Sequence, residues 1–163
     1  MKAAEPTTGY LFGRSGGDLL DVNVWLALAY DQHPKHQNAL NYWYEQLADA
    51  NTTLWFCRTT MLGLVRLLCQ PQVMGSDVLR LDTAWQVYEA FSAEPQVKLI
   101  IEPSDVDAKL ANLVNSTLPS KHLTDAYLFA LAQAAGLRLV SFDGDFSKFA
   151  APGSEDFLLL GGA

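Results

Sequence analysis

The chain alternates short apolar runs with amphipathic stretches of helical length, and this alternation restricts the fold more than any other feature of the sequence. Its clearest unit begins at Thr124, which stands in an N-cap position before an almost wholly apolar helix that runs through Ala135. Gly136 ends the helix, and a strand follows from Leu137 to Ser141. A helix that is apolar on most sides must be covered on most sides, so this unit belongs at the centre of a larger fold.

Four other apolar runs have the length of strands: Asp18 to Val22, Thr53 to Cys57, Val97 to Ile101 and, as an edge strand, Asp156 to Leu160. Apolar residues at helical spacing predict helices between them: one after Pro34, one from about Met61 to Leu68, one marked by Val78, Leu81, Trp85 and Tyr88, and one capped by Ser104 with Asp107. Strands that alternate with helices imply right-handed crossovers. We therefore expect a three-layer α/β/α sandwich around a mainly parallel central sheet.

With 163 residues, half of them hydrophobic, the chain has the size of one globular domain. We expect that domain to span residues 18–163, after a flexible N-terminal tail or cloning remnant over residues 1–17. The two cysteines, Cys57 and Cys69, are too few for a disulfide framework, and no apolar stretch is long enough to span a membrane. These features predict buried thiols and a cytoplasmic protein.

The formal net charge of −7 excludes a broad basic surface for nucleic acid. It does not exclude an enzyme that acts on nucleic acid, because carboxylates can hold divalent cations that face the phosphates.

Three aspartates are placed by the pattern at one edge of the predicted sheet. Asp21 closes the first strand, Asp125 opens the apolar helix, and Asp143 follows the strand that ends at Ser141. Each alone could complement a helix dipole or shape a turn. Ligands gather at the carboxyl ends of parallel strands, and three acids that meet there would repel one another unless protonated or bridged by a cation. Their convergence predicts Mg²⁺ or Mn²⁺, which prefer oxygen ligands.

Four stretches, two of which contain these acids, resemble in their order and spacing a PIN-domain ribonuclease of the VapC toxin type. The stretches are LLDVNVWLAL (19–28), HPKH (33–36) followed by Ala39 and Trp43, FCRTTMLGLVRLL (56–68), and TDAY (124–127) with LVSFDGDF (139–146). The resemblance implies an endoribonuclease that cleaves structured RNA, such as transfer RNA or a ribosomal loop, by a water activated by Mg²⁺ or Mn²⁺. It also implies a cognate antitoxin that inhibits the enzyme, and a homodimer.

By the same resemblance, Asp21, Asp125 and Asp143 are the expected metal-binding and catalytic acids. Four residues are expected to support them by orienting carboxylates or water, or by contacting phosphate: Asn23, Thr60, Arg66 and Ser141. For Arg66, a side chain that only reaches into solvent is an equal alternative.

Many PIN domains carry a glutamate in the helix after the second strand, but here no acid lies between Thr59 and Leu68. Either three aspartates suffice or another acid substitutes, with Asp145 and Glu102 as candidates. His122, just before the Asp125 helix, is expected to have a structural or substrate-contact role.

Two other functions stay open at this point. A receiver-like phospho-acceptor domain shares the α/β pattern and the metal, but it needs an acidic pair at the first strand, and Asp18 is the only acid close to Asp21. A catalytically silent PIN-fold binding module would keep the fold and its partner contacts without binding Mn²⁺.

Overall fold

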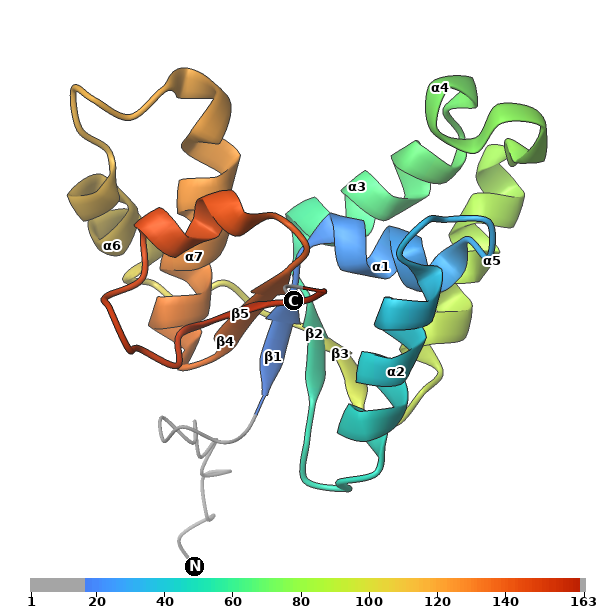
Figure 1. The fold of residues 1–163 in the computed structure, drawn as a ribbon, viewed down its shortest axis with the longest axis horizontal. Coiled ribbons are helices and arrows are strands. Elements are labelled where there is room, and N and C mark those ends of the chain that lie inside the picture. Colours follow the sequence, from blue (N-terminus) through green and yellow to red (C-terminus); the bar gives the residue numbers. More distant parts are fainter. Residues whose placement is uncertain (1–16, 162–163) are drawn as a thin grey trace, which may run out of the picture.

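The computed structural model describes residues 17–161, which form two helical layers around a five-stranded sheet (Figure 1). All neighbouring strands are parallel, in the order β3-β2-β1-β4-β5. The strands are β1 (Asp18–Leu20), β2 (Leu54–Phe56), β3 (Val97–Leu99), β4 (Arg138–Ser141) and β5 (Phe157–Leu159). Each lies inside a predicted run, and β5 is an edge strand as expected. The predicted three-layer α/β/α sandwich is confirmed.

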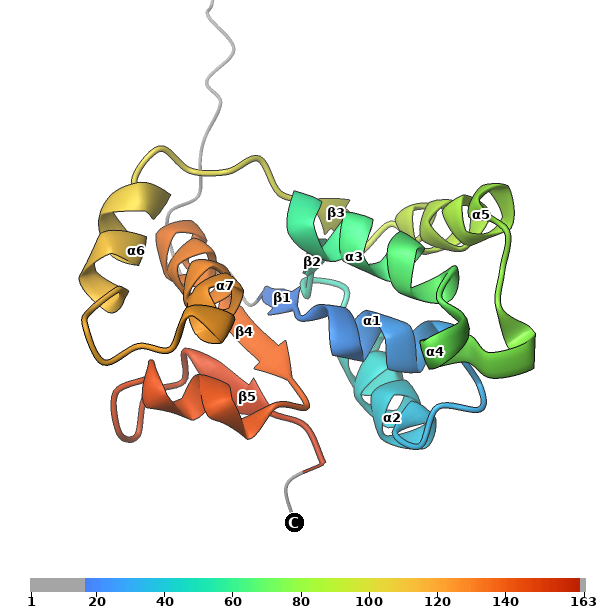
Figure 2. The same ribbon diagram turned by 90° about the horizontal axis from the view of Figure 1, so that it is seen from above.

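The strand order reverses at β1, because β2 and β3 lie on one side of it and β4 and β5 on the other. Chain segments therefore leave the carboxyl ends of β1 and β4 in opposite directions. In open parallel sheets, such a switch point is where ligands bind. Seen from above in Figure 2, it lies between α7 on one side and α1 and α3 on the other.

The seven described helices divide between the two faces of the sheet. One face packs against a cluster that includes residues of α1 (Val22–Ala29), α2 (His36–Leu47), α3 (Arg58–Leu68), α4 (Pro71–Met74) and α5 (Leu81–Ser92). The other packs against α6 (Val106–Leu113) and α7 (Leu123–Ala135). Short 3₁₀ turns, η1 (Gly75–Asp77), η2 (Ser120–His122) and η3 (Gly144–Lys148), complete the described elements.

The alternation of side chains along the strands builds these two cores. Leu20 and Val140 point into the larger cluster, whereas Leu19 and Leu139 point into the cluster under α7, and all four are fully buried. In the larger cluster, the ring of Trp25 stacks on Phe56 with centroids 3.7 Å apart. Burial of one such large side chain contributes roughly 1.5 to 3 kcal/mol.

The structure corrects three local predictions. Helix α7 begins at Leu123 directly after η2, so Thr124 lies inside its first turn and is not the N-cap. Helix α6 begins at Val106, and its cap residue, Asp105, makes no side-chain capping hydrogen bond, so the predicted capping box at Ser104 is absent there. Val78 precedes α5. Gly136 does end α7, in a left-handed conformation with φ of 66°.

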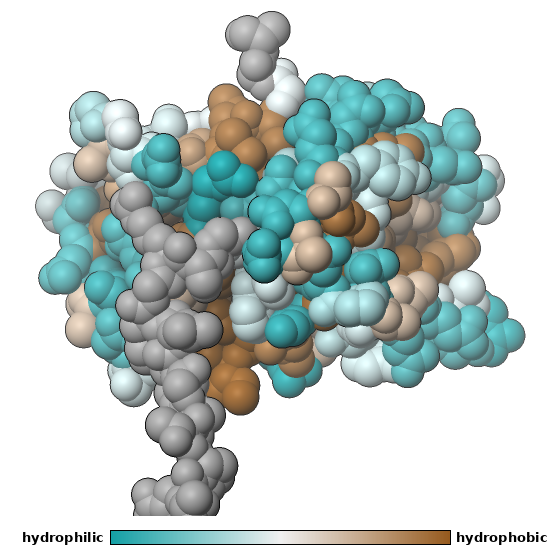
Figure 3. Space-filling view, turned by 90° about the horizontal axis from the view of Figure 1, so that it is seen from below, coloured by the Kyte–Doolittle hydropathy of each residue, from teal (hydrophilic) through white to brown (hydrophobic). Residues whose placement is uncertain are grey.

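The amino ends of β1 and β4 are joined by an ion pair between the buried Asp18 and the partly exposed Arg138. The guanidinium of Arg138 donates to both carboxylate oxygens of Asp18, at 2.9 and 2.8 Å, and the hydroxyl of Tyr42 donates to the same carboxylate. The surface around this end of the sheet, seen from below in Figure 3, is largely hydrophilic with hydrophobic residues scattered across it. Because Asp18 begins β1 and Asp21 follows its last residue, the ion pair lies at the opposite end of the strand from Asp21.

Gly17, the last residue of the predicted tail, is packed against the sheet. Its carbonyl accepts a hydrogen bond from the Arg138 amide at 3.1 Å, and a Cβ at this position would lie 2.9 Å from Trp55 Nε1. Residues 1–16 of the predicted tail lie outside the described residues. Within residues 17–161, no helix combines the length and the apolar character needed to cross a bilayer.

Candidate active site

Asp21 lies at the switch point, directly after β1, where it caps the N-terminus of α1. Its Oδ1 accepts the amide hydrogen of Val22 at 2.7 Å, and its Oδ2 accepts the hydroxyl hydrogen of Ser141 at 2.7 Å. Only 7% of the residue is exposed. The central strand pair thus holds one carboxylate in a fixed orientation at the edge where the strands end.

Ser141 connects Asp21 to two other residues of the site. The fully buried Ser141 hydroxyl oxygen accepts hydrogen bonds from Asn23 Nδ2 at 3.0 Å and from the Asp143 amide at 2.9 Å, while the hydroxyl donates to Asp21. Asn23 Oδ1 in turn accepts from the Phe142 amide at 3.3 Å. The structure thus places both Asn23 and Ser141 beside the first acid, as the sequence predicts.

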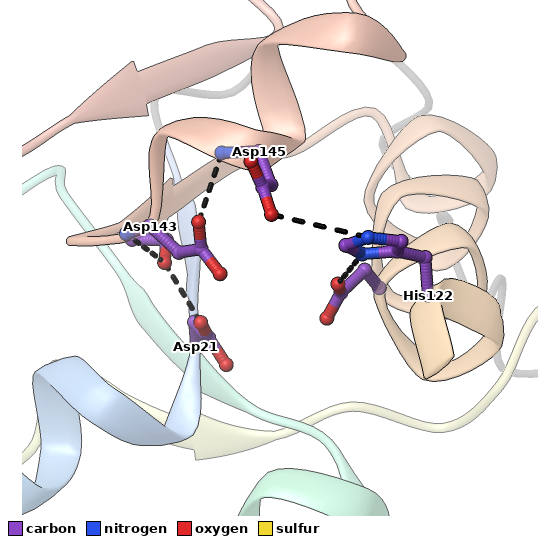
Figure 4. Close-up of polar contacts among 6 residues, drawn as sticks. Asp21, His122, Asp143 and Asp145 are labelled. Carbon is purple, nitrogen blue, oxygen red and sulfur yellow. Dashed lines mark hydrogen bonds and ion pairs between the residues drawn. The ribbon is translucent and has the colours of Figure 1, made fainter. Parts of the chain in front are cut away.

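Asp143 comes from the turn after β4 and is half-buried. Its Oδ1 accepts the amide hydrogen of Asp145 at 2.9 Å, which caps η3. Figure 4 shows the side chains of Asp21, Asp143, Asp145 and His122 arranged around one open space. Residues from the first and last thirds of the chain therefore share one site.

Asp125 comes from the first turn of α7, and His122 holds it. The Nδ1 atom of His122 lies 3.0 Å from Asp125 Oδ2, and its Nε2 atom lies 3.9 Å from Asp145 Oδ2. The sequence reasoning did not anticipate the bond between His122 and Asp125. The signal was their spacing of three residues, which places two side chains on the same face of a helix.

The charges of the three aspartates act on one another. Burial is the largest of the effects that together bring the pKa of Asp21 to about 6; the charges of Asp125 and Asp143 also raise it, and the hydrogen bonds from Ser141 and Val22 lower it. The carboxylates of Asp125 and Asp143 are therefore close enough to disfavour ionisation of Asp21. A cation bound among them would relieve this repulsion.

The donor atoms suit a hard divalent cation, because the acids offer carboxylate oxygens. Within residues 17–161, no three His, Cys, Asp or Glu side chains stand close enough to hold a metal ion among themselves. Mg²⁺ characteristically binds one or two protein carboxylates and keeps several waters. The arrangement therefore fits an ion whose shell is completed by water.

Among the described residues, Thr60 and Arg66 make no hydrogen bond or ion pair with Asp21, Asp125 or Asp143. Thr60 is fully buried, and its hydroxyl accepts from the Cys57 amide at 3.0 Å and donates to the Cys57 carbonyl at 3.1 Å, so it caps α3. Arg66 is exposed in the last turn of α3, eight residues beyond Arg58, which corresponds to about 12 Å along the helix.

The two candidates for a replacement acid also differ. Glu102 is exposed and accepts a hydrogen bond from the hydroxyl of Tyr127 at 2.6 Å. Asp145 faces His122 at the site itself (Figure 4).

In α3, a Cβ on Gly63 would lie 3.1 Å from Val22 Cγ2, so this helix packs tightly against the start of α1.

The receiver-like alternative loses its support in this geometry. It needs a second acid beside Asp21, and Asp18 instead pairs with Arg138 at the other end of β1. The acids that do interact with Asp21 come from α7 and from the turn after β4.

Comparison with known proteins agrees with this geometry. The sequence model of the PIN-domain family matches residues 19–152 of this chain. Ribonuclease VapC41 of Mycobacterium tuberculosis is 35% identical over 136 residues, which cover 80% of this chain and 92% of that protein. Ribonuclease VapC44 of the same species is 32% identical over 143 residues, which cover 83% and 92%.

Two solved structures share the fold. One is M. tuberculosis VapC20, described as a sarcin-ricin loop cleaving toxin, with a TM-score of 0.60 and 18% identity over 82% of this chain and 95% of that chain. The other is VapBC2 from Rickettsia felis, bound to a DNA fragment from its promoter, with a TM-score of 0.58 and 11% identity over 88% and 98%. The chain therefore belongs to the PIN-domain family, and within it to the VapC-type proteins.

Proposed function

We propose that this protein is a toxin of a toxin–antitoxin pair and that it cleaves RNA as a metal-dependent endoribonuclease. The observation that carries the proposal is the buried carboxylate of Asp21, whose pKa is raised by burial and by the charges of Asp125 and Asp143. Clustered carboxylates of this kind are stabilised by a cation, and Mg²⁺ and Mn²⁺ match their oxygen atoms. Relatives named ribonucleases support the reaction class.

In this proposal, one or two of the carboxylates of Asp21, Asp125 and Asp143 would bind the cation directly, and the remaining acid would reach it through its bound waters. A bound Mg²⁺ or Mn²⁺ supplies a water that is nucleophilic at neutral pH and neutralises charge on the phosphate. Hydrogen bonds from the Ser141 hydroxyl and the Val22 amide orient the two carboxylate oxygens of Asp21. A hydrogen bond from the Asp145 amide orients Oδ1 of Asp143. Water attacks phosphorus and the bond to the 3′ oxygen breaks, which leaves a 5′-phosphate and a 3′-hydroxyl.

The proposed substrate is structured RNA, such as a transfer RNA or a ribosomal loop. The description of VapC20 as a sarcin-ricin loop cleaving toxin is consistent with this class. Because the chain carries a formal charge of −7, binding depends on the cation and on local basic residues. Arg58, at the start of α3, and Lys121, in η2, are exposed near the carboxyl ends of the strands and suit this role better than Arg66.

The proposed protein partners are a cognate antitoxin and a second copy of the chain. The R. felis VapBC2 structure supports the first of these.

The decisive experiment is cleavage of total cellular RNA by antitoxin-free protein in Mn²⁺ and in EDTA. Asp21→Asn and Asp125→Asn are compared with Asp107→Asn, which changes an exposed acid in α6. We expect discrete fragments with wild type and Asp107→Asn in Mn²⁺, and none in EDTA or with the two site variants. Equal cleavage in EDTA would refute the proposed metal dependence.

One feature favours the catalytically silent module as the second candidate. The glutamate that many PIN domains carry in the helix after the second strand is missing here, since no acid lies between Thr59 and Leu68 in α3. Folded protein that neither binds Mn²⁺ nor cleaves RNA would establish this alternative.

A further inference from the structure

We propose that His122 is a positioning residue of the active site, which sets the carboxylate of Asp125 in the direction needed to hold the cation. This inference rests on the proposed function. Its basis is the bond between His122 Nδ1 and Asp125 Oδ2, at 3.0 Å, in a ring whose side chain is only 12% exposed.

The chemistry of the two groups fixes the direction of this bond. An ionised carboxylate only accepts hydrogen bonds, so Nδ1 of His122 must carry the proton and donate it. The bond engages Oδ2 of Asp125, and it thereby determines where the other oxygen, Oδ1, points. His122 reaches this position because it ends η2 three residues before Asp125, on the same side of the first turn of α7.

Each of the three acids has its own neighbour that orients it. The hydroxyl of Ser141 donates to Asp21, and the amide of Asp145 donates to Asp143. His122 does the equivalent for Asp125. Such neighbours of metal-binding groups set the orientation and basicity of the ligand, so their removal weakens metal binding without removing a ligand.

His122 also faces Asp145, which lies in η3 two residues after Asp143. Its Nε2 lies 3.9 Å from Asp145 Oδ2, which is too long for a hydrogen bond, while the backbone of the same Asp145 holds Asp143 (Figure 4). The ring therefore lies between the first turn of α7, which carries Asp125, and η3, which begins directly after Asp143.

Three substitutions separate the two ring nitrogens. His122→Ala removes both. His122→Asn puts an amide nitrogen at the place of Nδ1, and His122→Gln puts one at the place of Nε2. His33→Ala, in the loop between α1 and α2, is the matched control. Mn²⁺ binding to each full-length variant is measured by isothermal titration calorimetry, and circular dichroism checks the fold.

We expect His122→Ala to weaken Mn²⁺ binding by about 10- to 100-fold, which is the usual effect of losing such a neighbour. His122→Asn restores most of the affinity and His122→Gln does not. Cleavage of RNA by His122→Ala recovers as Mn²⁺ is raised, because the defect lies in affinity for the ion. A purely structural role would leave cleavage reduced at every Mn²⁺ concentration.

The inference is overturned if His122→Ala binds Mn²⁺ as wild type does, or if His122→Asn is as weak as His122→Gln. The second comparison decides the matter even where His122→Ala fails to fold. Wild-type protein that binds no Mn²⁺ would refute the proposed function and this inference together. Wild-type binding that His122→Ala leaves unchanged refutes this inference alone.

Discussion

Replacing Asp21 by asparagine should stabilise the metal-free protein at neutral pH while it abolishes activity. The pKa of this carboxyl is about 6 in the folded chain, against an ordinary value of 3.8. Between these two values the folded chain keeps a proton that the unfolded chain has lost. The stability contributed by this group is therefore full below pH 3.8 and is lost as the pH rises through about 6.

The size of the effect follows from the two pKa values and from the contacts. The raised pKa corresponds to about 3 kcal/mol of lost stability at pH 7.5, where Asp21 is ionised. Asparagine escapes this penalty, but its amide nitrogen meets a Ser141 hydroxyl that already accepts hydrogen bonds from Asn23 and Asp143. One hydrogen bond is lost, at about 1 kcal/mol, so a net gain of about 2 kcal/mol is expected.

The assay is chemical denaturation of wild type and Asp21→Asn in EDTA, at pH 7.5 and at pH 5. The advantage of the variant should shrink by about 1.4 kcal/mol at pH 5, because the folded wild type is then largely protonated. This difference between the two pH values does not depend on the lost hydrogen bond. An Asp21→Asn variant that is destabilised equally at both pH values would refute the reasoning, and Asp107→Asn, an exposed acid, should show no such pH dependence.

Three more predictions concern the contacts around the sheet. Ser141→Ala leaves the carboxylate of Asp21 without its buried donor, and should reduce Mn²⁺ affinity about 10- to 100-fold by calorimetry; unchanged affinity would contradict the role given to the hydroxyl. Arg138→Ala leaves the buried carboxylate of Asp18 with the Tyr42 hydroxyl as a remaining donor, and should destabilise the fold by about 1 to 3 kcal/mol in urea; a stability equal to wild type would show that the ion pair contributes nothing. Gly17→Ala forces a Cβ to within 2.9 Å of Trp55 and should destabilise by about 1 to 3 kcal/mol; a stability equal to wild type would show that the neighbours yield.

The sheet was predictable because each strand lies in an apolar run bounded by polar or turn residues, and burial on both faces requires such runs. Cap positions were less predictable. Thr124 is a favourable N-cap residue, but the chain enters α7 directly from η2, so the helix starts earlier. That start is set by the packing of η2 and α7, which leaves no local signature in the sequence.

The three aspartates were predictable because topology alone brings the ends of β1 and β4 and the start of α7 to one edge. The contacts that orient them were only partly predictable. Ser141 and Asn23 were expected beside Asp21. The bond from His122 was missed, and so was the capping of α3 by the Thr60 hydroxyl. Side-chain direction decides such contacts, and spacing along the chain does not specify it.

The ion pair of Asp18 and Arg138 helps to fix the register between β1 and β4, the two strands that lead to Asp21 and Ser141. In β1 and β4 the neighbours Leu19 and Leu139, and Leu20 and Val140, are apolar on both faces, so hydrophobicity distinguishes poorly between one alignment and its neighbours. Asp18 lies opposite Arg138 in the observed alignment, three residues before Asp21, just as Arg138 precedes Ser141. A shift of this register by one residue would separate the buried carboxylate of Asp18 from Arg138. Two charges at the amino end of the strand pair thus set the register that places the carboxylate of Asp21 beside the hydroxyl of Ser141.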